Sequence, residues 1–130
     1  MPEANMNISE QMVATDKDCI VIVNALTDVP GGRTLDVSGL PSDMKVLNAG
    51  HIIVKTTATG VHKPLAVTGT PLAYDSKSEG DEFVGVLKAS IPVSDPRAAI
   101  VTSGQINAAA SPFPVTDTIK SGLPRIEFLY

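Results

Sequence analysis

The sequence contains no tryptophan, and phenylalanine and tyrosine together make up only 4% of its 130 residues. Hydrophobic residues still account for 43% of the chain. A core can therefore form, but small and β-branched aliphatic side chains must fill most of it. The length suits one domain, and a two-domain enzyme with a large cleft is not expected at this size.

Cysteine is nearly absent as well. The single thiol, Cys19, excludes an internal disulfide, and it lies directly before an apolar run. Its position predicts a buried, inert thiol rather than a reactive or metal-binding one.

Long hydrophobic runs and clustered positive charge are also missing. No stretch approaches the roughly 18 apolar residues of a membrane span, and residues 1–11 lack the basic and apolar regions of a secretory signal. The net charge is −4, and the ten basic residues are isolated from one another along the chain. We therefore expect a soluble protein that binds neither membrane nor nucleic acid.

Motifs for nucleotide or calcium binding are incomplete. A phosphate-binding loop starting at Gly50 would need a second glycine beside Lys55, and the sequence has none there. The acidic loop that starts at Asp75 has Lys77 at the third ligand position of a calcium loop and Val86 at the twelfth. This loop is therefore interpreted as a solvated acidic surface.

The two histidines, His51 and His62, lack a matching cysteine or carboxylate at zinc-site spacing, so surface imidazoles are expected. No catalytic motif can be assembled either. The sequence predicts no catalytic residue, no cofactor and no metal, and the protein is not expected to be an enzyme.

Short β-prone runs separated by turns dominate the chain after residue 30. Residues 51–56 and 61–67 are predicted to pair as a hairpin, and Pro64 places the second strand at an edge or makes it bulged. Gly85 suggests a bulge or a close approach of two backbones. Further strands are expected at residues 83–88, 98–102, 105–108 and 125–129.

One helix is predicted near the C-terminus, at residues 115–121. Thr116 or Thr118 would cap its start, and Gly122 followed by Pro124 would end it. Together these elements predict a mainly β fold, a small barrel or sandwich of short strands with one short helix.

The N-terminal segment differs from the rest. Residues 1–30 are polar apart from one β-prone run at residues 19–23, and they are predicted to form an extended arm ahead of a β-rich domain at residues 31–130. The backbone groups of that run must find partners. They are satisfied either by strand addition to another protein, or in the sheet of this chain or of a neighbouring subunit.

From residue 31 onward the chain resembles a known family over about 100 residues, a span wide enough to suggest kinship. The blocks that carry the similarity are GGRTLDVSG at 31–39, AGHII at 49–53, VGVL at 84–87, SDPRAAI at 94–100, GQINAA at 104–109 and LPRIEF at 123–128. In this order they resemble the head fiber proteins of tailed phages of gut Bacteroidetes. The chain is similar, more loosely, to the lambda-type head decoration proteins.

The resemblance implies a virion protein, made in the host cytoplasm, that sits on the outer capsid surface. Such a protein binds the major capsid protein as a homotrimer and acts without cofactor or catalysis. In lambda-type relatives the N-terminal segment becomes ordered on the capsid. The resemblance itself stops near residue 31, but the isolated β-prone run before it suits this role best, so the capsid-binding residues are expected to be Ile20, Val21, Ile22 and Val23.

The main alternative within the virion is a fiber base that displays an adhesive tip to host surface glycans. The acidic loop would then be an exposed recognition loop, with Tyr74, Asp75, Lys77 and Glu79 as the contact residues. A small β-barrel enzyme or carrier is the remote alternative, and no site was found for it.

Overall fold

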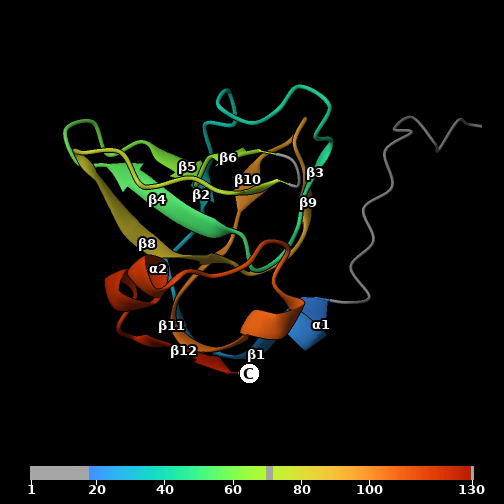
Figure 1. Cartoon of the computed structure of the whole chain (residues 1–130), viewed down its shortest axis with the longest axis vertical. Coiled ribbons are helices and arrows are strands. Elements are labelled where there is room, and N and C mark those ends of the chain that lie inside the picture. The colour runs from blue at the N-terminus through green and yellow to red at the C-terminus, as the bar shows by residue number, and fades with distance from the viewer. Residues whose placement is uncertain (1–17, 70–71, 130) are drawn as a thin grey trace, which may run out of the picture.

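The computed structural model describes residues 18–69 and 72–129 and shows a mainly β fold (Figure 1). The main sheet has six strands in the order β1-β11-β8-β4-β5, with β12 added alongside β11. Its strands are β1 (Ile22–Asp28), β4 (Ile52–Thr56), β5 (His62–Pro64), β8 (Asp81–Leu87), β11 (Ile100–Asn107) and β12 (Ile126–Leu129). The predicted fold class is confirmed, and within the described residues the sheets are sandwich-like and form no closed barrel.

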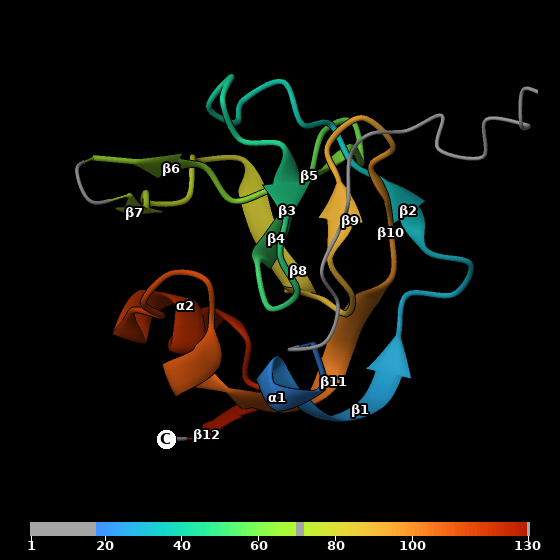
Figure 2. The same cartoon turned by 90° about the vertical axis from the view of Figure 1, so that its right-hand side faces the viewer.

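Three two-stranded sheets accompany the main sheet, and each pairs two short segments. In both views they lie toward the end of the molecule opposite β12 (Figures 1 and 2). The pairs are β2 (Arg33–Thr34) with β10 (Arg97–Ala98), β3 (Val46–Leu47) with β9 (Ile91–Pro92), and β6 (Val67–Thr68) with β7 (Ala73–Tyr74).

The predicted hairpin is present as β4 and β5, with Lys55 opposite His62 and Ile53 opposite Pro64. Pro64 lies on the edge strand, where its missing N–H removes no ladder bond inside the sheet. Gly85 lies on β8 where the carbonyl of Val101 occupies the place that a Cβ would take. The predicted close approach is therefore confirmed.

The strand β11 differs from the prediction. Two strands were expected on either side of a turn at residues 103–104, but one strand runs through Gly104. This glycine has φ 155°, and the carbonyl of Asn24 on β1 lies where its Cβ would stand. The two-strand prediction is wrong because the glycine serves a close approach of β1 rather than a turn.

The predicted C-terminal helix is α2 (Asp117–Gly122), which begins two residues later than expected. The hydroxyl of Thr116 accepts the N–H of Ile119 at 3.4 Å and caps it. Two short helical elements were not predicted, α1 (Asp18–Val21) and the 3₁₀ helix η1 (Ala108–Ala110). The run at residues 19–23 is therefore split between α1 and the first residues of β1.

Aliphatic side chains cover both faces of the main sheet. Successive residues of a strand point to opposite faces. Accordingly, Ile52 and Val54 of β4 belong to one buried cluster, which also contacts Ile119 of α2. Ile53 belongs to a second cluster on the other face, together with Leu87. The main sheet is therefore packed against aliphatic side chains on both of its faces.

Candidate functional site

The four residues predicted to bind a capsid differ in how far their side chains are exposed to solvent. Val21 is buried in the core, and its side chain lies where a Cβ on Gly50 would be. Ile22 is half-buried opposite Ile106 of β11. Only Ile20 and Val23 are exposed. The prediction is corrected for Val21 and Ile22, because α1 turns the first inward and sheet pairing covers the second.

The predicted boundary after residue 30 is also corrected. β1 pairs with β11 from Ile22 to Asp28, and the N–H of Val29 donates to the carbonyl of Ile100 at 2.9 Å. The backbone groups of this segment are therefore satisfied in the chain's own sheet, which was one of the two possibilities left open. Residues 22–28 belong to the folded unit, and residues 1–17 of the predicted arm lie outside the described residues.

The start of α1 is tied to the body of the protein by a polar contact. The carboxylate of Asp18 accepts from the hydroxyl of Ser90 at 2.8 Å and from its backbone N–H at 2.9 Å. The same hydroxyl accepts the N–H of Ala49 at 3.0 Å. This contact fixes the direction in which the chain enters β1.

The outer edge of the sheet presents large apolar side chains to solvent. Ile20 of α1 is 51% exposed, and Val23 and Leu26 of β1 are 47% and 66% exposed; we call these three residues the apolar strip. Val23 and Leu26 fall at register shifts, where neither has a Cα partner on β11. Each is thus the extra residue of a bulge.

This edge is open to other molecules. Among the described strands, β11 alone pairs with β1. Of the five exposed large hydrophobic residues in the described ranges, three form the apolar strip, and the others are Val61 and Leu72. Exposed apolar side chains on and beside an open sheet edge are typical of an interaction surface.

The predicted recognition loop lacks its aromatic face. The hydroxyl of Tyr74 accepts the N–H of Ile52 at 3.2 Å, and its ring packs edge-on against His51 at 5.1 Å and Phe113 at 5.3 Å between centroids. Burial also raises the pKa of Tyr74. The prediction of an exposed Tyr74 is wrong, because the ring fills space beside the core.

The other three residues of that loop do not share one neighbour. The carboxylate of Asp75 accepts from Thr68 at 2.6 Å, and the ammonium of Lys77 lies 5.9 Å from the ring centre of Phe83. Glu79 is exposed. The four predicted residues therefore do not form one recognition face.

Two predictions about single residues are also wrong. His51 is buried, its Nε2 donates to the carbonyl of Leu65 at 2.9 Å, and burial lowers its pKa to about 4. Cys19 is exposed on α1 rather than buried. His62 is half-buried on β5. Residues 18–69 and 72–129 contain no group of three or more His, Cys, Asp or Glu that could hold a metal ion.

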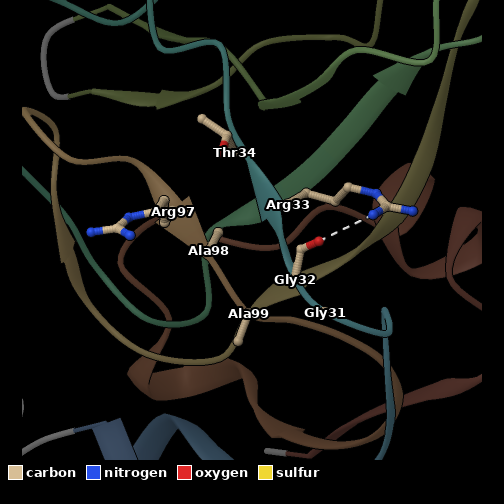
Figure 3. Close-up of a pocket in the computed structure, with 7 residues that line it drawn as sticks. All are labelled: Gly31, Gly32, Arg33, Thr34, Arg97, Ala98 and Ala99. Carbon is tan, nitrogen blue, oxygen red and sulfur yellow. Dashed lines mark hydrogen bonds between the residues drawn. The ribbon is translucent and has the colours of Figure 1, made fainter.

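A hollow between β2 and β10 is lined by two arginines, Arg33 and Arg97, that are distant in the sequence and lie on paired strands (Figure 3). In the close-up, Arg33 and Arg97 point away from each other to opposite sides. Arg97 forms two 2.9 Å bonds to Asp95, and Arg33 donates to the carbonyl of Gly32 at 3.2 Å. Because the two charges do not converge, this hollow is not an anion site.

Comparisons with protein-family models, with curated proteins and with solved structures found no match to this chain. The helices in the described ranges are too short and too polar to span a membrane.

Proposed function

We propose that this chain is a structural virion protein, without catalytic activity, that binds the outer surface of an assembled tailed-phage capsid as a homotrimer. The observation that carries the proposal is the apolar strip, with Val23 and Leu26 on the open edge strand β1 and Ile20 on the helix α1 that leads into it. The resemblance of residues 31–130 to head fiber and decoration proteins supports it independently, because the strip lies before those residues.

The strip gives each copy a modest interaction. Burying the exposed half of an aliphatic side chain contributes about 1 kcal/mol. Three such residues bind weakly by themselves once the costs of association are included. A trimer that presents three strips to one shell binds far more tightly, because the second and third contacts form within the same complex. The proposed trimer therefore matches the small size of the strip.

Shell stabilisation follows from mass action. A ligand that binds only the assembled shell stabilises it by about 2.7 kcal/mol per site when its free concentration is a hundred times its Kd. Many sites on one shell add to this effect. The major capsid protein is the partner that this mechanism requires.

Co-sedimentation with purified shells that lack the chain tests the proposal. The double variant V23K/L26K should stay folded, because both side chains are exposed, and should lose most of its binding. V61K is the matched control, since Val61 is a 42% exposed aliphatic residue away from the strip. Equal binding by the two variants would overturn the assignment of the strip.

Light scattering tests the proposed oligomeric state. We expect a trimer at micromolar concentration, and a monomer of 13.5 kDa would contradict the proposed assembly. The same measurement on V23K/L26K separates two uses of the strip. If that variant becomes monomeric, the strip holds copies of this chain together and does not face the capsid.

The adhesive alternative at residues 74–79 has lost its main support. Carbohydrate recognition usually combines polar groups with an aromatic face. Tyr74 was the aromatic residue of that loop, and its hydroxyl and ring are engaged with Ile52, His51 and Phe113.

A further inference from the structure

An apolar groove lies between two consecutive turns at residues 37–44 and the segment that follows β9. Its volume is about 380 Å³, and Lys45 is the charged residue of its lining. Most of the lining is apolar, and each of these apolar side chains is half-buried. They are Val37, Leu40, Pro41, Met44 and Val93.

Backbone hydrogen bonds hold the two sides of the groove together. The N–H of Met44 donates to the carbonyl of Pro41 at 3.0 Å and closes one of the turns. The N–H of Val93 donates to the carbonyl of Lys45 at 2.9 Å and joins one side to the other. Because these backbone groups are already paired, the groove offers side chains to a ligand rather than an open strand edge.

The groove keeps apolar surface that the described fold covers only in part. Val37, Leu40 and Met44 pack against the core cluster that contains Ile53 and Leu87, yet each of the three remains partly exposed. Several partly exposed apolar side chains around one hollow are typical of a binding surface.

The start of the described chain lies close to this groove. Asp18 is hydrogen-bonded to Ser90, and only the two residues of β9 separate Ser90 from Val93. An extended strand rises about 3.3 Å per residue, so Val93 lies about 10 Å from Ser90. In both views α1 lies below the β3–β9 pair, and the turns at residues 37–44 lie above it (Figures 1 and 2).

The residues before Asp18 have the length and the pattern to cover the groove. Four extended residues span up to about 14 Å, enough to reach Val93, and residues 6–13 precede them in the sequence. Within residues 6–13, Ile8 and Met12 are apolar and stand an even number of positions apart, with Glu10 midway between them. Alternate residues of an extended segment share one side. The residues on the other side, around these positions, are polar: Asn7, Ser9 and Gln11.

We propose that residues 6–13 of the same chain bind in this groove. The side of the segment that carries Ile8 and Met12 contacts the apolar lining. Glu10, on that same side, lies near Lys45, whose opposite charge attracts it.

The covalent connection through Asp18 favours this occupant over a separate molecule. A separate partner must overcome the entropy cost of association before a groove of this size holds it. A segment of the same chain is kept near the groove at an effective concentration in the millimolar range, so a weak contact is sufficient.

This inference does not depend on capsid binding. In both views β1 lies at the end of the molecule opposite the turns at residues 37–44 (Figures 1 and 2). A segment that runs from Asp18 to the groove therefore leads away from Val23 and Leu26, and the apolar strip stays exposed.

Nuclear Overhauser effects in the full-length chain test the proposal. We expect cross-peaks from the methyl groups of Ile8 and Met12 to those of Val37, Leu40 and Met44. A sample that mixes isotope-labelled with unlabelled copies shows whether these cross-peaks arise within one chain or between two chains.

Two double variants with the same added charge give the matched comparison. I8K/M12K should shift the backbone amides of the groove residues, because their contact with the segment is lost. S9K/Q11K adds its lysines on the other side of the segment and should leave those amides unchanged. Unchanged amides along β4 in both variants show that the fold is intact.

Three results would overturn the proposal. These are the absence of the cross-peaks, cross-peaks that arise only between two copies, and equal shifts of the groove amides in the two variants. Shell binding is measured separately, and its absence in a chain that shows the cross-peaks would overturn the proposed function alone.

Discussion

The two edges of the main sheet differ in length and in chemistry. β1 has seven residues and carries Val23 and Leu26 exposed to solvent. β5 has three residues and includes Lys63 and Pro64, and its His62 carbonyl accepts the N–H of Asp36 at 2.9 Å. One edge is long and apolar, while the other is short, charged and covered by a neighbouring loop.

Proteins usually protect sheet edges, because an open edge invites pairing with other chains. β5 shows three common forms of protection, namely short length, a lysine and a proline. β1 has register shifts that disturb regular pairing but keeps its apolar side chains exposed. This contrast supports the proposal that β1, and not β5, contacts a partner, and that it does so through its exposed side chains.

The largest effect is expected from V21D. Val21 is 6% exposed in the core, so a buried carboxylate there should lower the free energy of unfolding by about 4 kcal/mol. I20D changes the neighbouring residue, which is 51% exposed, and should cost no more than about 0.5 kcal/mol while weakening capsid binding. Urea unfolding followed by circular dichroism measures both, and equal destabilisation would contradict the described packing of α1.

The attachment of β1 is tested next by G104A. A Cβ on Gly104 would collide with the backbone of Asn24, so we expect a loss of about 3 kcal/mol and faster amide exchange along β1. G60A is the control, because Gly60 also has positive φ but open space around it, and its cost should be about 1 kcal/mol. Similar losses in the two variants would mean that β1 does not lie against β11 as described.

Lowering the pH should lower the free energy of unfolding through the buried His51. Its pKa is about 4 in the folded protein against 6.5 for the free side chain, so protons bind the unfolded state more strongly. The stabilising contribution is complete above pH 6.5 and is lost as the pH falls from 6.5 to 4, up to about 3 kcal/mol.

An NMR titration of the His51 ring protons checks this directly, with His62 as the internal comparison. Burial lowers the pKa of His62 as well, but its side chain is half-buried and not enclosed. A midpoint for His51 near 6.5 would contradict its burial against Leu65, Tyr74 and Phe113.

The smallest effects concern two neighbouring carboxylates at the polar edge. D81N should cost about 2 kcal/mol, because its largely buried carboxylate bonds to Lys63 and Thr56. E82Q removes a surface pair with Lys55 in which both side chains are substantially exposed, and should cost less than about 0.5 kcal/mol. Thermal unfolding distinguishes the two, and the reverse order would contradict the described ion pair of Asp81 with Lys63.

Local sequence signals predicted the elements that depend on local chemistry. The β4–β5 hairpin, the close approach at Gly85 and the Thr116 cap of α2 were all identified from turn residues, a glycine and a capping residue. The thin aliphatic core followed from composition in the same way.

The errors arose where contacts between residues distant in the sequence determine the local conformation or the burial of a side chain. Gly104 looks like a turn residue until β1, 80 residues earlier at Asn24, is placed against it. His51 is buried because Tyr74 and Phe113 close over it, and no spacing along the chain reveals that. The run at residues 19–23 has β-prone composition, but the contact between Asp18 and Ser90 accompanies a helical start.

The ion pair of Lys63 with Asp81 could not be found from the sequence for the same reason. The two residues belong to separate segments with no shared motif. Only the placement of β5 and β8 on either side of β4 brings the lysine to the aspartate. The sequence predicted two of the three residues of the apolar strip, because Ile20 and Val23 were expected to be contact residues and Leu26 was not.

Electron cryomicroscopy of shells decorated with this chain tests the central claim most directly. Our account predicts trimeric density on the outer capsid surface, with Ile20, Val23 and Leu26 facing the shell and β5 away from it. Shells without added density, or density in which β1 faces solvent and β5 contacts the capsid, would contradict it.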